Sequence, residues 1–341
     1  MSINSYGLLK GKAIDSKQGM GSSPHYQVLV SDDERLHRIA INVKSQMQPS
    51  ALLYFLDENF EHPLINEIEG LPLGFTPLKS KNGGIALDFI RGNLFKPSAM
   101  KPLPHDVAGL DNDLNELIHK YIHKAIAMEN SSIYAFGEKW GSETKRDRYF
   151  GFKPGSGVHD IHMNQGNDKR WQKDDGIYQD GAIIIHFPDE TRWVGIFLAF
   201  QSQCFHTGDI HGHKIDAKCH IEQEKVFTDT TEQKDGIRII AAMVNPLKNE
   251  RGRESITLIN LSDTTINIEQ WSLADSRKRK EMLHGTVEAG ETRKIILSGK
   301  STRLVNKGDI ITLLDEKGIK VDGVSYTKKD ASKEGWSILF N

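Results

Sequence analysis

Two nearly uninterrupted apolar runs on either side of one short turn constrain the fold of this chain more than any other feature of its sequence. Residues 181–187 (GAIIIHF) and 193–200 (WVGIFLAF) flank the turn PDET at 188–191. Short apolar runs bounded by turn residues are typical of strands that are buried on both faces. The pattern therefore predicts a β-hairpin in a sheet that other elements cover on both sides.

Further elements are expected before the hairpin. Residues 6–14, 25–30 and 36–43 predict strands, because β-branched residues alternate and turn residues separate the segments. Residues 44–110 are rich in proline and predict irregular structure, and residues 129–178 predict loops. Since the second of these stretches contains Tyr149 and Phe150, we expect it to be ordered and functional.

One amphipathic helix is expected over residues 112–128, where apolar residues recur at helical spacing behind the start signal DND at 111–113. His119 and His123 lie one turn apart on its polar side, but the glutamate of an HExxH motif is missing, so we interpret them as solvated histidines. The N-terminal region is thus predicted to be an α+β domain with a mostly antiparallel sheet and one clear amphipathic helix.

The length of 341 residues predicts two or three domains. Residues 222–236 are charged and polar and predict a linker between a domain at 1–221 and another at 237–341. Residues 236–341 carry 18 basic and 14 acidic side chains, a net charge of +4, so the rest of the chain carries −6 of the total of −2. Such a small positive charge predicts at most weak, salt-dependent nucleic-acid binding by the C-terminal domain.

Membrane insertion is not expected, because no apolar run approaches the roughly 18 residues that a membrane helix needs. The first residues lack the apolar core of a secretory signal, and two cysteines cannot form a disulfide scaffold. We therefore expect a cytoplasmic protein.

The C-terminal domain contains about seven short predicted strands separated by turn signals, which indicates a β-sandwich. Its segments ESITLINLSDTTINIEQWSLAD, GTVEAGETRKIIL and LVNKGDIITLLDEKG follow one another as in the lamin tail domain, which the sequence resembles over 237–341. The resemblance implies an immunoglobulin-like fold and a non-catalytic module, with Trp271 as a core residue.

The N-terminal region also resembles a known family. The segments GGIALDFIRGNLF, YAFGEKWG, FGFKPGSGVHDIHMNQGN and DGIYQDGAIIIHFP occur in this order. They are similar to the YukJ-like family of uncharacterised bacterial proteins over residues 1–220. This resemblance implies no mechanism, so the chemistry must be inferred from the residues.

Seven of the 14 histidines fall between residues 159 and 220, which points to this span as the chemical centre. His159, Asp160, His162 and Asn164 are metal-type ligands within six residues, and in an extended segment the last three share one face. Together with Asp180 they could hold a divalent Zn, Mn or Mg ion. Alternatively, the two imidazoles could act without metal as general base and general acid, or the segment could be a hydrogen-bonded loop.

The register of the hairpin brings a second group of residues to this region. If paired residues sum to 379 or 380, Asp180 lies opposite Ala199 or Phe200, and Gln201 and Gln203 follow on one face. This arrangement resembles the restriction-endonuclease pattern, with glutamines in place of its second acid and its lysine. Neutral amides could orient water or substrate but cannot act as a base. The cluster from Cys204 to His220 lacks standard zinc spacing and predicts a polar surface loop.

Two functions from different classes follow. The first is a hydrolase, such as a metal-dependent phosphodiesterase or nuclease, with metal ligands Asp160, His162 and Asp180 and catalytic residues His159, His162, Asn164, Gln201 and Gln203. In this hydrolase the lamin-tail module would serve in recognition of the substrate. The second is a non-enzymatic protein that binds a ligand or partner through the loops of residues 157–213.

Overall fold

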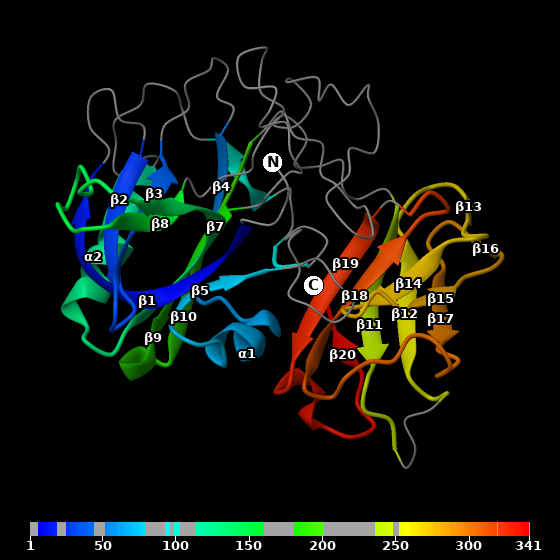
Figure 1. Cartoon of the computed structure of the whole chain (residues 1–341). Coiled ribbons are helices and arrows are strands. Elements are labelled where there is room, and N and C mark those ends of the chain that lie inside the picture. Colours follow the sequence, from blue (N-terminus) through cyan, green and yellow to red (C-terminus); the bar gives the residue numbers. More distant parts are fainter. Residues whose placement is uncertain are drawn as a thin grey trace. The chain divides into compact units, whose positions relative to one another are not determined.

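The computed structural model describes residues 6–18, 25–43, 52–78, 93–95, 99–102, 114–159, 181–200, 236–247, 252–318 and 320–340 (Figure 1). The chain divides into two compact units. The first comprises Met1–Phe60, Ile68–Lys79 and Ala99–Gln203, and the second Glu61–Glu67, Ser80–Ser98 and Cys204–Asn341. Neither of the two α-helices in the described part of the chain is long and apolar enough to cross a membrane.

The first unit is built on one large sheet of ten strands in the order β5-β1-β2-β3-β8-β7-β9-β10-β4-β6. The strands in chain order are β1 (Tyr6–Lys17), β2 (His25–Ser31), β3 (Leu36–Asn42), β4 (Leu52–Asp57), β5 (Gly74–Pro77), β6 (Lys101–Pro102), β7 (Ser132–Glu143), β8 (Gly155–His159), β9 (Gly181–Phe187) and β10 (Arg192–Phe200). All neighbours pair antiparallel except β3 and β8, which are parallel. The sheet is therefore mostly antiparallel.

Five of these strands close into a barrel. Tyr6–Gly11 of β1 pair with β7, whereas Lys12–Lys17 pair with β2. β1 is strongly curved (Figure 1) and its pairing is irregular between Ala13 and Asp15. Because β7 also pairs with β8 and β8 with β3, the ladder β1-β2-β3-β8-β7 returns to β1.

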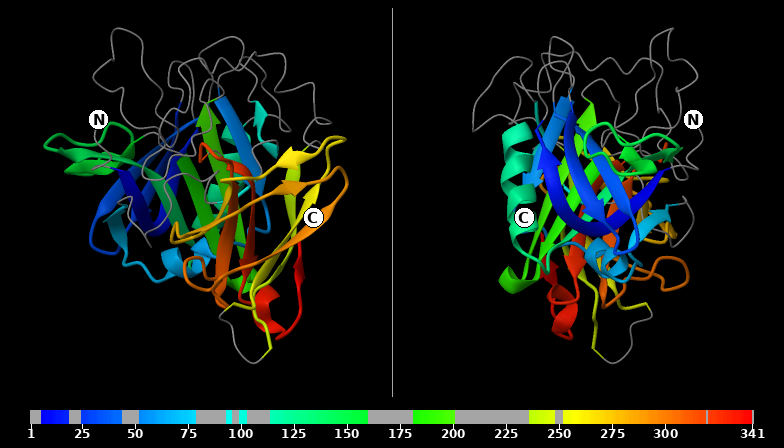
Figure 2. Two further views of the ribbon diagram at one scale, coloured as in Figure 1. Left: turned by 90° about the vertical axis from the view of Figure 1, so that its right-hand side faces the viewer. Right: turned by 60° about the vertical axis from the view of Figure 1, so that its left-hand side comes forward.

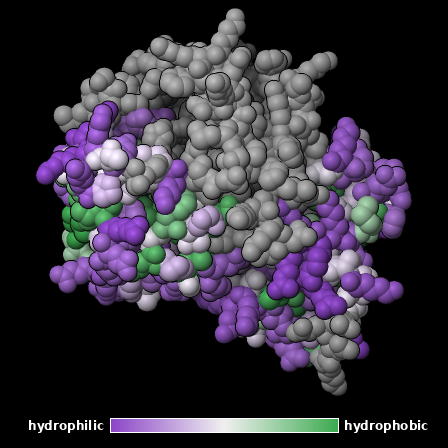
Figure 3. Space-filling view, viewed as in Figure 1, coloured by the Kyte–Doolittle hydropathy of each residue, from purple (hydrophilic) through white to green (hydrophobic). Residues whose placement is uncertain are grey.

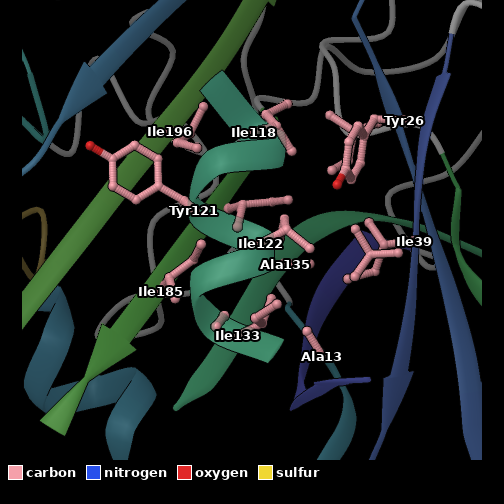
Figure 4. Packing of buried hydrophobic residues seen from close by; sticks show 14 of the residues in the cluster. Ala13, Tyr26, Ile39, Ile118, Tyr121, Ile122, Ile133, Ala135, Ile185 and Ile196 are labelled. Atoms are coloured by element: carbon pink, nitrogen blue, oxygen red, sulfur yellow. The ribbon is translucent and has the colours of Figure 1, made fainter. Parts of the chain in front are cut away.

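Helix α2 (Leu114–Ala127) precedes β7 and packs against the barrel interior (Figures 2 and 4). One of its faces buries Leu114, Ile118, Tyr121, Ile122 and Ala125. These side chains join a single apolar core with inward residues of β1, β2, β3, β7, β9 and β10. At about 25 cal/mol per Å² of apolar surface, burial of this face supplies most of the stability of the helix.

Two stretches differ from the sequence prediction. Within residues 44–110, expected to be irregular, the structure has β4, β5, β6 and the short helix α1 (Leu64–Glu69). Within residues 129–178, expected to be loops, it has β7 and β8. In β7, Ile133, Tyr134, Ala135 and Phe136 are all buried, which removes the alternation of polar and apolar residues that marks a half-exposed strand.

The hairpin prediction is confirmed. β9 and β10 pair antiparallel with Arg192 opposite Phe187 and Leu198 opposite Gly181, a register in which paired numbers sum to 379. A short 3-10 turn, Pro188–Glu190, connects the strands, and Thr191 closes it in the left-handed conformation.

The second unit contains a β-sandwich, as the sequence predicts. One sheet has the order β17-β12-β11-β20 and the other β15-β14-β18-β19, with the pair β13-β16 beside them. The strands are β11 (Ile237–Met243), β12 (Ser255–Asn260), β13 (Ile266–Asn267), β14 (Ser272–Asp275), β15 (Lys280–Met282), β16 (Thr286–Val287), β17 (Thr292–Ile296), β18 (Gly308–Leu314), β19 (Lys320–Thr327) and β20 (Ile338–Leu339). Trp271 packs partly buried against the apolar core between the sheets. The visible face of this unit is mostly hydrophilic (Figure 3).

Asn93 belongs to this second unit although it lies far from the sandwich in sequence. Its side-chain amide donates hydrogen bonds to the carbonyl of Ile311 at 3.0 Å and to Thr312 Oγ1 at 3.1 Å. Gly323 leaves room for it, because a Cβ there would lie 2.0 Å from Asn93 Oδ1. The sandwich is thus supported by a residue from outside 237–341.

Candidate functional site

Most of the residues predicted to carry chemistry lie outside the described part of the chain. Those outside it are Asp160, His162, Asn164, Asp180, Gln201 and Gln203. The backbone of His159 is described as the last residue of β8, paired with Glu138. The expected approach of Asp160 or His162 to Asp180 also lies outside the described residues. Within the described residues, no group of three or more His, Cys, Asp or Glu side chains could hold a metal ion.

The strands that lead into these residues nevertheless end together. The end of β3 pairs with the start of β2, Asn42 opposite His25, and β8 runs parallel to β3. The start of β9 lies beside the last residues of β10, and Phe200 pairs with Leu52 at the start of β4. The chain therefore leaves β3, β8 and β10, and enters β2, β4 and β9, at one end of the sheet.

A buried arginine is the centre of a polar and aromatic cluster on the outer face of β2 and β3. Arg38 Nε donates to Asp147 Oδ2 at 2.5 Å, and its Nη1 donates to Gln27 Oε1 at 2.7 Å. The guanidinium also lies 4.9 Å from the ring centroid of Trp140 and 4.8 Å from that of Tyr149. Arg38 is only 9% exposed, so these groups replace water around its charge.

Asp147 fastens the loop of residues 144–154 to this face. Besides Arg38, it accepts hydrogen bonds from the backbone N–H groups of Tyr149 and Phe150, both at 2.9 Å. Burial by itself raises the pKa of Asp147, but the hydrogen bonds from Arg38 and the two N–H groups outweigh it and hold the pKa below its usual value. The carboxylate is therefore charged at neutral pH and the loop is fixed.

Gly157 makes this packing feasible. It pairs with Arg38 across the parallel β3–β8 ladder, and a Cβ at this position would lie 1.7 Å from the Arg38 carbonyl oxygen and 2.7 Å from the Trp140 ring. Only glycine allows the indole and the neighbouring strand to approach so closely.

The outward side of the same loop is basic. Lys145, Arg146 and Arg148 are exposed, and Tyr149 and Phe150 are half-buried beside them. Arg148 Nη2 donates to the Tyr149 hydroxyl at 2.6 Å, and its guanidinium lies 4.7 Å from the ring centroid. Lys17 donates to the Tyr149 carbonyl and lies 5.3 Å from the Phe150 ring centroid. Cations and aromatic rings thus alternate over one patch, which we call the loop 144–154 face.

The sequence indicated this loop only in part. Its aromatic residues marked it as ordered and functional, but Arg38 has no local signal, because a polar residue in an alternating strand usually faces solvent. Its partner Asp147 lies 109 positions further along the chain.

Comparison with known proteins gives two family matches. Residues 1–212 match the family described as "Uncharacterized conserved protein (DUF2278)", and residues 230–328 match the Lamin Tail Domain. The chain is also 45% identical to "Uncharacterized protein YukJ" of Bacillus subtilis over 219 residues, which cover 63% of this chain and 96% of that protein. No solved structure matches the chain.

Proposed function

The chain belongs to the DUF2278 family and carries a lamin tail domain, and we propose that it binds single-stranded nucleic acid through the loop 144–154 face. The observation that carries this proposal is the Arg38–Asp147 pair, which fixes a basic and aromatic loop over β2 and β3. We assign the N-terminal domain to the α+β class, with α2 as its amphipathic helix. From its two cysteines we also propose that the protein is cytoplasmic.

The connectivity of the barrel supports this choice by analogy. Five strands in the order β1-β2-β3-β8-β7 return to β1, β3 and β8 are parallel, and α2 lies between β3 and β7. This is the connectivity of an OB-fold, in which the second and third strands and two flanking loops bind oligonucleotides or oligosaccharides. The corresponding face here is that of β2 and β3, flanked by residues 144–154. A likeness of fold does not establish function, so the residues must supply the chemistry.

The residues favour a phosphate-containing polymer over a sugar. Lys145, Arg146 and Arg148 are three exposed cations that could each neutralise a phosphate. Phe150 is half-buried beside them, and an unpaired base could stack on its ring, which is worth roughly 1–3 kcal/mol per base. The ring of Tyr149 contacts Arg38 and Arg148 and would hold the loop in place. Because stacking needs bases that are free of their complementary strand, the face should prefer single strands to duplex.

Fluorescence anisotropy with a labelled oligothymidylate tests the proposal. Three phosphate contacts predict a slope of about −2 for log K against log salt, or roughly a 20-fold loss of affinity between 50 and 200 mM salt. Replacement of Lys145, Arg146 and Arg148 by alanine should remove most of the binding. A duplex of equal length should bind more weakly than the single strand.

A matched control removes the same charge elsewhere. Lys300, Lys317 and Lys328 are exposed in the second unit, and their joint replacement by alanine should leave binding within about twofold. Equal losses in the two triple variants, or no binding by the unmodified protein at 50 mM salt, would reject the proposed face.

A hydrolase is the second candidate function. It is favoured because β8 and β10 end, and β9 begins, at the same end of the sheet, and the predicted residues are next to these strand ends in the sequence. In this proposal Asp160, His162 and Asp180 hold a divalent Mg, Mn or Zn ion. An imidazole, His159 or His162, moves the proton, and the amides of Asn164, Gln201 and Gln203 orient water or substrate. The substrate would be the phosphodiester polymer itself.

Nuclease and phosphodiesterase assays with each metal test this second candidate. His162→Ala and Asp180→Asn should each lower turnover by roughly 100-fold or more, the usual scale for the loss of an acid–base group. Unchanged turnover in both variants would reject His162 and Asp180 as catalytic residues, and no turnover by the unmodified protein with any of the three metals would reject the hydrolase.

A further inference from the structure

The polar side of α2 carries two histidines whose rings are in contact. His119 and His123 are one helical turn apart, and their ring centroids are 3.9 Å apart with the planes inclined by 51°. His119 is half-buried and His123 is exposed. The opposite side of the helix is anchored in the core by Ile118 and Ile122 (Figure 4), so the backbone that carries both imidazoles is fixed.

A buried tyrosine positions the inner imidazole. Tyr26 of β2 is fully buried, and its hydroxyl lies 2.8 Å from His119 Nδ1. Burial raises the pKa of Tyr26 to about 12, so its hydroxyl keeps its proton at neutral pH. Burial, and then the neighbouring His123, lower the pKa of His119 below its usual value.

The direction of this hydrogen bond depends on the tautomer of His119. When the ring carries its proton on Nδ1, Nδ1–H donates to the tyrosine oxygen and Nε2 keeps its lone pair, and this is the tautomer that a metal ion bound to Nε2 would select. A metal-binding histidine typically has its second nitrogen held in this way. The carboxylate of Asp15 also acts on Tyr26, and its negative charge would favour a nearby cation.

The geometry points to a site for one divalent transition-metal ion, held by His119 Nε2 and a ring nitrogen of His123 and completed by water. Two nitrogens that bind one ion at about 2.0–2.1 Å lie roughly 3 Å apart. Because the two rings are already in contact, rotation of the exposed His123 side chain would bring its nitrogen to this distance from His119 Nε2. Imidazole ligands select Cu²⁺, Ni²⁺ and Zn²⁺ over Mg²⁺ or Ca²⁺, with Cu²⁺ bound most tightly. This site shares no residue with the loop 144–154 face or with residues 159–203, so it goes beyond the proposed function.

Calorimetric titration of the full chain with Ni²⁺ tests the site. Because the chain has 14 histidines, the informative quantity is the difference between variants. His123→Ala should remove one equivalent of Ni²⁺ binding relative to the unmodified protein, and since His123 is exposed the fold should be retained. His284→Ala removes an exposed histidine of the second unit and should remove none. Equal stoichiometry and affinity in all three proteins would overturn the site.

Two further measurements separate the site from nickel bound elsewhere. Tyr26→Phe removes only the positioning hydroxyl, and it should weaken the same equivalent by 10- to 100-fold without changing the stoichiometry. Ni²⁺ should also slow the modification of His119 and His123 by diethyl pyrocarbonate, mapped by mass spectrometry. An unchanged rate at both histidines would mean that the pair binds no metal.

Discussion

The Arg38–Asp147 pair provides the sharpest test of how the first unit is held together. Asp147 is 3% exposed, and its two oxygens serve different partners. Oδ2 accepts from Arg38, whereas Oδ1 accepts from the backbone N–H groups of Tyr149 and Phe150. Asp147→Asn therefore removes the ion pair but keeps the turn acceptor, and Asp147→Ala removes both.

The expected magnitudes follow from what each variant leaves unpaired. Removal of one partner of a buried ion pair leaves an uncompensated charge and costs about 3–5 kcal/mol. We expect about 3 kcal/mol for Asp147→Asn and about 4–5 kcal/mol for Asp147→Ala, since each lost backbone hydrogen bond adds about 1 kcal/mol. Adding Arg38→Met to Asp147→Ala should recover at least about 1 kcal/mol, because no buried charge then remains.

Urea unfolding followed by circular dichroism and tryptophan fluorescence measures these differences, with a separate transition fitted for each unit. At a slope of about 2 kcal/mol per molar urea, the midpoint of the first unit should fall by roughly 1.5–2.5 M. The exposed Asp263 of the second unit is the matched control, and Asp263→Asn should stay within about 0.5 kcal/mol. A cost below about 1 kcal/mol for Asp147→Ala would refute the proposed role of the pair.

Four more outcomes are expected. Gly157→Ala should abolish the folding of the first unit at 37 °C, seen as loss of soluble protein or of its cooperative transition, because the added Cβ meets the Arg38 carbonyl at 1.7 Å. Acid should destabilise the first unit, because folding lowers the pKa of Asp147. The contribution of Asp147 to the free energy of unfolding is complete above its unfolded pKa of about 3.9 and is lost as the pH falls toward its folded pKa. A series of urea midpoints at different pH values measures this loss. A fragment of residues 237–341 should unfold cooperatively in calorimetry, and Gly323→Ala should cost more stability in the full chain, where Asn93 occupies the space, than in this fragment.

The sequence by itself determined the elements whose signals are local. The apolar runs around residues 188–191 predicted a hairpin and limited its register to paired numbers that sum to 379 or 380, and the structure has 379. The ordered motifs of residues 237–341 identified the lamin tail domain and its sandwich. The N-terminal segments identified the YukJ-like family, and residues 1–212 match the DUF2278 family.

The tertiary structure alone decided which strands close the barrel and which polar side chains meet. β1 pairs with β2 along one half and with β7 along the other, and residues more than 120 positions apart carry the second pairing. Arg38 and Asp147 are separated by 109 positions, and Tyr26 and His119 by 93. No short window of sequence contains both members of such a pair, so periodicity could place His119 and His123 on one side of a helix but could not supply the tyrosine. These contacts exist because folding brings distant segments together. The free-energy cost of burying the charge of Arg38 or the hydroxyl of Tyr26 is offset by a partner from elsewhere in the chain.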